Sequence, residues 1–161
     1  MLGSGNSRNQ VRAVRVRKPG SRGAALVEFA IVALLLFTLT FGIIEFGLLI
    51  RDYLAINHAA REGSRSAAVG SPVEVVLDRV QKSAPTLSVS LADIDLTTGS
   101  PATSPDSWAS LGNSADGTKN DAVSGNLILV QVSYEHQMVT GGLFNDGAPI
   151  SLLGKMIMRR E

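Results

Sequence analysis

The residues that could do chemistry are few and are scattered along the chain. Two carboxylates, Glu28 and Glu45, stand within residues 24–50, a stretch that is otherwise uncharged. An acid in apolar surroundings is costly unless it is paired, so both are candidate functional residues. The 161-residue chain has no cysteine, only two histidines (His58 and His136) and no G-x-S-x-G nucleophile motif. We therefore do not expect an enzyme.

Metal ligands are also sparse. His58 has no second histidine, cysteine or acidic cluster at ligand spacing. Asp116, Asn120 and Asp121 offer oxygen atoms in a polar stretch, but their spacing is not that of an EF-hand loop. We predict no metal site and no cofactor.

Glu28 follows Gly23 by five residues, and the two mark a junction in the chain. Before it, residues 1–22 carry six basic residues and no acid, a net charge of +6. Because the whole chain has a net charge of +1, residues 23–161 have a net charge of −5. Basic residues beside a membrane span are retained in the cytoplasm, which places residues 51–161 outside. A basic arm can also bind nucleic acid. Next to an apolar segment, retention at the inner surface is the expected role, and we expect no nucleic-acid partner.

The apolar stretch itself predicts a membrane span. As a helix, residues 24–50 would be about 40 Å long, which exceeds the roughly 30 Å hydrocarbon core of a bilayer. The alternative is a core helix of a soluble protein, but such helices keep a polar face, and this stretch has none. Residues 1–23 are then a basic cytoplasmic leader. No small-x-small site of a secretory signal peptide follows the apolar residues.

The junction Gly23-Ala24-Ala25-Leu26-Val27-Glu28-Phe29 resembles the cleavage site of type IV prepilins. The resemblance implies that a prepilin peptidase in the inner membrane cuts after Gly23, so that the mature chain begins at Ala24. Glu28 would then pair with the free α-amine of its own chain or of a neighbouring subunit, and Glu28 and Phe29 would act in assembly. The alternative is an interfacial Glu28 whose carboxylate merely reaches the water.

A longer resemblance runs from Arg22 to Ala68 and includes Val27-Glu28-Phe29-Ala30, Ile44-Glu45-Phe46-Gly47 and Ala59-Ala60-Arg61-Glu62-Gly63-Ser64-Arg65. This stretch is similar to the TadE-like family, the minor pilin-like or pseudopilin proteins of tight-adherence (Flp) pilus systems. The resemblance implies an inner-membrane structural component whose partners are prepilin peptidase, other pilus or pseudopilus subunits, assembly proteins and membrane lipid. Many members carry a proline where Ala33-Leu34 stands here, so we expect a straighter helix.

Glu45 lies 17 residues after Glu28, about 26 Å along a helix, near the outer boundary of the membrane. It could contact a partner helix during assembly, or it could simply be solvated at the interface. Both readings stay open.

Residues 51–70 are predicted to continue the helix into water. A stripe of small residues at a spacing of four lies on this extension: Ala59, Gly63 and Ala67. Small residues permit close packing, either of a neighbouring subunit or of the protein's own sheet. Plain helix propensity would explain the alanines but not the glycine.

Residues 71–161 are predicted to form a small extracytoplasmic α+β domain. A helix is expected from Ser71 to Ala84, with a capping box made by Ser71 and Glu74. Alternating apolar residues predict antiparallel strands at 87–96 (with a bulge), 126–139 and 150–159, with a long polar loop at 97–125 that Trp108 anchors. A long N-terminal helix beside a short sheet is a pilin-like plan.

Two functions remain open from the sequence. The first is a pseudopilin-like component of a tight-adherence pilus. The second is an unprocessed, single-pass periplasmic scaffold or binding protein. The junction separates them, because an intact N-terminus on the mature protein would favour the second.

Overall fold

The computed structural model describes residues 21–141 and 147–161. Most of the predicted basic leader, residues 1–20, therefore lies outside the described residues. The chain divides into two units within one helix, Met1–Leu39 and Thr40–Glu161. That helix, α1, spans Ser21–Ala68 without interruption.

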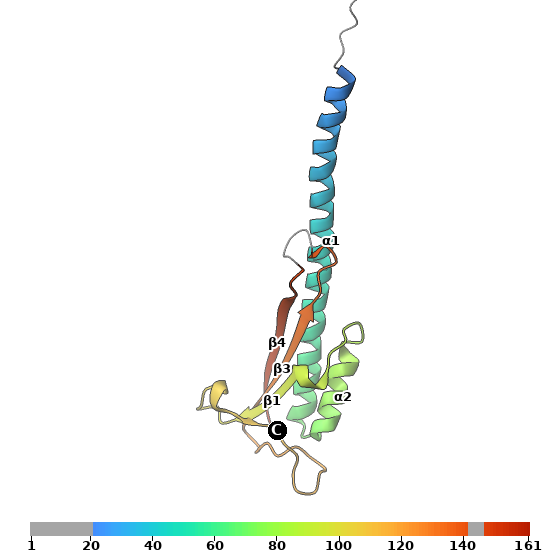
Figure 1. Ribbon diagram of the computed structural model, residues 1–161. Coiled ribbons are helices and arrows are strands. Elements are labelled where there is room, and N and C mark those ends of the chain that lie inside the picture. The colour runs from blue at the N-terminus through green and yellow to red at the C-terminus, as the bar shows by residue number, and fades with distance from the viewer. Residues whose placement is uncertain (1–20, 142–146) are drawn as a thin grey trace, which may run out of the picture. The chain divides into compact units, whose positions relative to one another are not determined.

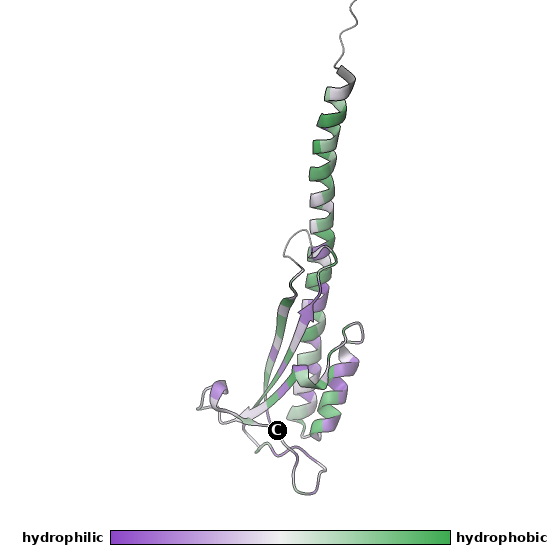
Figure 2. Ribbon diagram, in the orientation of Figure 1, coloured by the Kyte–Doolittle hydropathy of each residue, from purple (hydrophilic) through white to green (hydrophobic). Residues whose placement is uncertain are grey.

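The first unit contains the N-terminal part of α1. From Gly23 to Leu39 nearly every residue is exposed, including large apolar side chains such as Leu26 (69%) and Phe29 (70%). Figure 2 shows this part of α1 as almost uniformly hydrophobic. A helix that is apolar on all sides needs an apolar environment. Among the described residues, α1 is the one helix that is long and apolar enough to cross a membrane.

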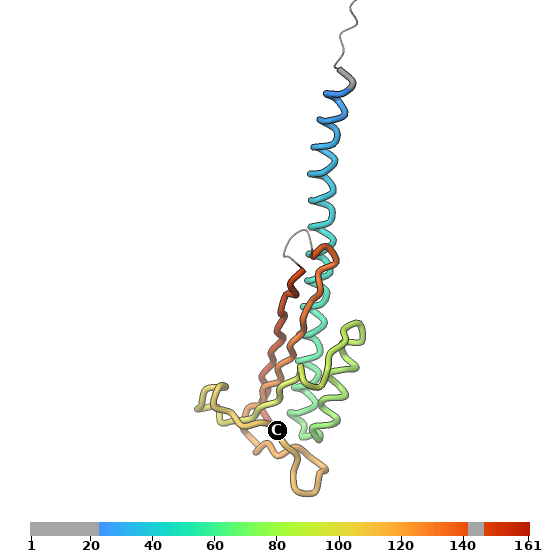
Figure 3. The backbone as a smooth tube through the Cα atoms, in the orientation of Figure 1, coloured from blue at the N-terminus to red at the C-terminus, as the bar shows by residue number. Residues whose placement is uncertain are grey.

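The second unit pairs the remainder of α1 with a four-stranded antiparallel sheet of order β2–β1–β3–β4. The strands are β1 (Ile94–Gly99), β2 (Ala109–Ser110), β3 (Leu127–His136) and β4 (Ile150–Arg159). β3 and β4 pair along their whole length, from Leu127 opposite Arg159 to His136 opposite Ile150. Figures 1 and 3 show these two strands running beside the C-terminal half of α1.

The core lies between the sheet and two helices, α1 and α2 (Val73–Ser83). Alternate residues of β3 are completely buried: Ile128, Val130 and Val132. Gly63 of α1 lies where these layers meet, because a Cβ atom there would overlap Val80 and lie 3.2 Å from Val130 Cγ1. Ala59 and Ala67 are fully buried in the same core. The stripe therefore packs on the protein's own sheet, one of the two alternatives left open, and also on α2.

The predicted cap of α2 is wrong. The N-cap residue is Pro72, and neither it nor Ser71 supplies a side-chain cap. Instead, Asn113 Oδ1 accepts a 2.8 Å hydrogen bond from the Val73 N–H, and Asn113 Nδ2 donates to Glu74 at 2.9 Å. The bond from Asn113 lowers the pKa of Glu74. Asn113, 40 positions after Val73, thus supplies the cap that Ser71 was predicted to supply.

The region between α2 and β3 also differs from prediction. The strand expected at 87–96 begins only at Ile94, because Leu91–Asp93 form a 3-10 turn that Ser90 caps. The loop expected at 97–125 contains the end of β1, all of β2 and a bridge between Asn113 and Asn120. The predicted anchoring role of Trp108 is supported by the indole's close approach to Gly99 and a 3.0 Å bond from Nε1 to Thr103 Oγ1.

The predicted fold class is confirmed: a long N-terminal apolar helix followed by a small antiparallel sheet in an α+β arrangement. The predicted strands at 126–139 and 150–159 are present as β3 and β4.

Candidate functional site

The junction residues lie at the start of α1, in the first unit. Gly23 falls in the first turn of the helix, with nothing within 4 Å of the position that a Cβ would take. Ala24, Glu28 and Phe29 are all exposed. Glu28 makes no ion pair within the part of the chain that the structure describes. Its carboxylate is therefore available to a group from outside the described chain.

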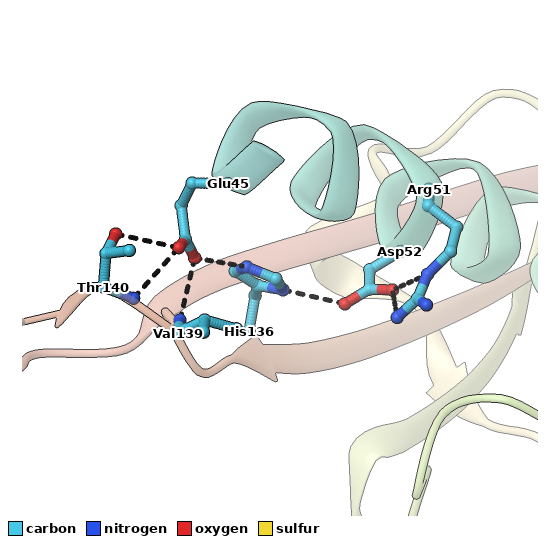
Figure 4. Close-up of polar contacts among 6 residues, drawn as sticks. All are labelled: Glu45, Arg51, Asp52, His136, Val139 and Thr140. Carbon is cyan, nitrogen blue, oxygen red and sulfur yellow. Dashed lines mark hydrogen bonds and ion pairs between the residues drawn. The ribbon is translucent and has the colours of Figure 1, made fainter. Parts of the chain in front are cut away.

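The second acid of the apolar stretch has the opposite environment. Glu45 is only 6% exposed and lies in a buried polar cluster with His136 (4%) and Asp52 (2%). Glu45 and Asp52 are seven residues apart on α1, which places them on one face of the helix, two turns apart. His136, the last residue of β3, lies between them (Figure 4). We call these three residues the Glu45–His136–Asp52 cluster.

Each ring nitrogen of His136 contacts one carboxylate. Nδ1 lies 2.7 Å from Asp52 Oδ2, and Nε2 lies 3.4 Å from Glu45 Oε1. Two carboxylates thus lie against one imidazole ring. Asp52 also accepts hydrogen bonds from Arg51 Nε and Nη2, at 2.9 and 2.8 Å. The cluster is thus linked through Asp52 to a positively charged neighbour at the surface.

Glu45 also fastens the chain that follows β3. Its two carboxylate oxygens accept hydrogen bonds from the backbone N–H of Val139 (3.0 Å) and of Thr140 (3.1 Å), and from the Thr140 hydroxyl (2.9 Å). Charge-assisted hydrogen bonds of this kind are stronger than neutral ones. The cluster therefore ties β3 and the residues after it to α1 (Figure 4).

The expectation that Glu45 is solvated at the membrane interface is wrong, because the side chain is buried and hydrogen-bonded within the second unit. Its contact with a partner helix stays a prediction. Sequence reasoning missed Asp52 and His136 altogether. The seven-residue spacing of Glu45 and Asp52 was a usable signal, whereas nothing in the sequence connects His136 with residues more than 80 positions away.

The three side chains of the cluster are buried, and the bonds of Glu45 hold backbone N–H groups and the Thr140 hydroxyl. Within residues 21–141 and 147–161, no group of three or more His, Cys, Asp or Glu side chains is arranged to hold a metal ion.

The fold and the helix together define a class of protein: a small α+β domain that follows an apolar helix long enough to anchor it in a membrane. The comparisons with known proteins find one similarity, over part of the chain. Residues 23–65 match the family model described as TadE-like protein, which confirms the resemblance noted in the sequence over these residues. Comparison with curated proteins gives no match, and comparison with solved structures gives none either.

The match covers the junction, the apolar stretch and the cluster residues on α1, and it ends before the sheet begins. It implies a protein associated with tight-adherence pili, in a family whose members are structural rather than catalytic and interact with other pilus components.

Proposed function

We propose that the protein is a pseudopilin-like structural component of a tight-adherence pilus and that a prepilin peptidase cuts it after Gly23. The mature chain then begins at Ala24, with Glu28 as its fifth residue. The observation that carries the proposal is the junction. A glycine precedes, by five residues, an exposed carboxylate at the start of an apolar helix, and this helix matches the TadE-like family.

The exposed surface of the helix supports an assembly role. Its large apolar side chains are exposed, and Leu26, Phe29 and Leu34 are 69–70% exposed. Apolar surface on this scale is covered in a working protein. A bilayer covers it before assembly, and neighbouring helices cover part of it afterwards. The proposed partners are accordingly the peptidase, other pilus or pseudopilus subunits, assembly proteins and lipid.

The proposed topology has the leader, residues 1–23, in the cytoplasm and the domain, residues 71–161, outside it. Residues 24–50 span the membrane, and residues 51–70 extend the helix. The part before Glu45 already measures about 30 Å, the thickness of the hydrocarbon core. A reporter that is active only in the periplasm, fused after Glu161, should therefore be active. Activity of a cytoplasmic reporter at the same position, with a silent periplasmic one, would reverse the topology.

Glu28 has the central role in the proposed assembly. We expect its carboxylate to pair with the α-amine of Ala24 on a neighbouring subunit, in surroundings where water is scarce. Removing one member of a desolvated ion pair typically costs about 3–5 kcal/mol, and about 1.4 kcal/mol already corresponds to tenfold in an equilibrium constant. Loss of Glu28 should therefore weaken association strongly. Insertion should not suffer, because the substitution removes a charge that is unfavourable near lipid.

The experiment compares Glu28→Ala and Glu28→Gln with the wild type by crosslinking or co-purification of pilus components from membranes, at matched abundance. Both variants should be inserted and processed but poorly associated. Thr38→Ala is the matched control, because Thr38 lies in the same helix and its hydroxyl donates only to Leu34 O one turn back. If both Glu28 variants associate as well as the control, the carboxylate is a solvated interfacial group and the proposed pairing is wrong.

The second candidate function is an unprocessed, membrane-anchored scaffold or binding protein. One observation favours it: Gly23 lies inside the first turn of α1 rather than in an extended segment. A peptidase that binds its substrate in an extended form must first unwind that turn. The N-terminus of the protein in the membrane distinguishes the two functions.

A further inference from the structure

The outer face of the sheet, opposite the helices, carries a cavity that the proposed pilus function does not use. Its volume is about 720 Å³, within the range of small-molecule sites. The floor is formed by β1, β3 and β4, and one wall by the segment that contains Pro105, Asp106 and Trp108. The cavity belongs entirely to the second unit.

Two rows of side chains cross the floor. In one row, Asp95 of β1 lies opposite Gln131 of β3, which lies opposite Lys155 of β4. Neighbouring strands are about 4.8 Å apart, so the backbones at Asp95 and Lys155, which are two strands apart, lie about 10 Å from each other. No ion pair joins these two side chains in the described structure. The row therefore presents a carboxylate, an amide and an ammonium group to whatever occupies the cavity.

The next row is largely apolar. Thr97, Leu129 and Ile157 lie opposite one another across the same three strands. Ile157, on the edge strand β4, is 44% exposed. Trp108 adds the surface of its indole ring to the cavity. The ring N–H already donates a hydrogen bond to Thr103, so the ring offers apolar surface rather than a free donor. Aromatic and aliphatic surface thus stands beside a line of hydrogen-bonding groups.

One buried hydroxyl on the floor of the cavity is unsatisfied. Thr97 Oγ1 has no hydrogen-bond partner among the described residues. Buried polar groups without a partner are uncommon and usually have a reason.

We infer that this cavity binds a neutral saccharide. A sugar ring has an apolar C–H face, which fits the indole and Ile157, and a rim of hydroxyls, which fits groups that both donate and accept hydrogen bonds. The charged side chains of the cavity are Asp95, Asp106 and Lys155. Two carboxylates against one ammonium disfavour a phosphate or another anion.

An extended peptide fits less well. Peptides that add to sheets bind through the free backbone groups of an edge strand. Here β3, at the centre of the floor, is paired on both sides, and the free backbone edge belongs to β4 at the side of the floor, so a peptide lying over the floor would meet side chains. The inference does not rest on the pilus assignment, because no residue of the cavity lies within residues 23–65.

Trp108 makes the inference testable, since it is the only tryptophan in the chain. The full-length protein in detergent or nanodiscs is titrated with a panel of neutral oligosaccharides (maltotriose, cellotriose, chitotriose, mannotriose and galactotriose), while the Trp108 fluorescence is recorded. Sialyllactose and an unstructured neutral peptide serve as the anionic and peptide probes. At least one neutral oligosaccharide should change the emission with saturation at millimolar concentration or below.

Variants then assign the response to the cavity. Gln131→Ala and Lys155→Ala should each weaken the binding about tenfold, the size expected for the loss of a hydrogen bond to a ligand. Lys82→Ala is the matched control, because Lys82 is exposed on α2 and pairs only with Asp78. Circular dichroism confirms that each variant is folded. The inference is overturned if no neutral oligosaccharide of the panel binds, if the peptide or sialyllactose binds instead, or if Lys82→Ala weakens binding as much as Lys155→Ala.

Discussion

The two acids of the apolar stretch look alike in the sequence but meet different surroundings. Glu28 is exposed on the first unit, whereas Glu45 is buried in the second and accepts hydrogen bonds from Val139 and Thr140. Their substitution should therefore have different consequences. Loss of Glu28 should weaken association between subunits, and loss of Glu45 should weaken the fold of the domain itself.

His136 allows the role of the Glu45–His136–Asp52 cluster to be tested. His136→Ala leaves two buried carboxylates without the group that lies between them. Breaking a buried ionic contact in this way costs about 3–5 kcal/mol, so we expect the free energy of unfolding to fall by that amount in a denaturant titration of the full chain. Glu45→Gln, which keeps a hydrogen-bonding side chain, should cost less.

The chain offers a matched control in His58, the other histidine, which is exposed on α1. His58→Ala should leave the free energy of unfolding nearly unchanged. Equal effects of His58→Ala and His136→Ala would mean that the cluster does not hold the domain together.

At the scale of elements, the long segment between β1 and β3 places Leu111 and Ala122 in the core, and its tip is held by polar side chains. Asp116 accepts hydrogen bonds from the Ser114 hydroxyl at 2.6 Å and from the Thr118 hydroxyl at 2.8 Å. The bonds from Ser114, and then those from Thr118, lower the pKa of Asp116 from 3.8 to about 2. These contacts fold the tip of the segment back on itself.

A pH dependence follows from Asp116. Because its pKa is lower in the folded protein than in the unfolded chain, its stabilising contribution is present above its ordinary pKa of 3.8 and is lost as the pH falls towards 2. Asp116→Asn should therefore be less stable than the wild type at pH 6, and the difference should vanish near pH 2. Parallel stability curves for the wild type and Asp116→Asn would contradict this.

The elements that the sequence predicts well are those with a strong local pattern. Alternation over ten residues is enough for β3 and β4, and the absence of a polar face is enough for the apolar part of α1. The start of α2 and the segment before β1 were predicted less well. The cap comes from Asn113, 40 positions away, and the apparent strand at Leu87–Leu91 loses its regularity where Ser90 caps a turn.

The candidate functional residues also differ in how well the sequence predicts them. The Gly23–Glu28 junction is local, and it can be read directly from the sequence. The cluster depends on the register that brings the end of β3 beside α1, because His136 meets Asp52 across 84 positions. No periodicity along the chain reports such a contact. The same holds for the row Asp95, Gln131 and Lys155, which exists only once three strands are paired.

On the scale of the whole molecule, the family match and the sheet lie in different parts of the chain. The TadE-like match ends at residue 65, and the sheet lies beyond it. Ala59 and Gly63 of the small-residue stripe belong to the matched region and Ala67 lies just beyond it, but all three lie in the core formed with the unmatched sheet and α2. The matched helix therefore presents exposed apolar side chains in its first part and packs in the core of the domain in its second.

The N-terminus of the protein in the membrane tests the central proposal most directly. The wild type, Gly23→Leu and the control Gly20→Leu are extracted from membranes of a host with prepilin peptidase, and the intact mass and N-terminal sequence of each are determined. The wild type and Gly20→Leu should begin at Ala24, whereas Gly23→Leu should remain a precursor that begins near Met1. A wild-type protein that begins near Met1 and does not differ from Gly23→Leu would contradict processing at Gly23 and favour the unprocessed membrane-anchored scaffold.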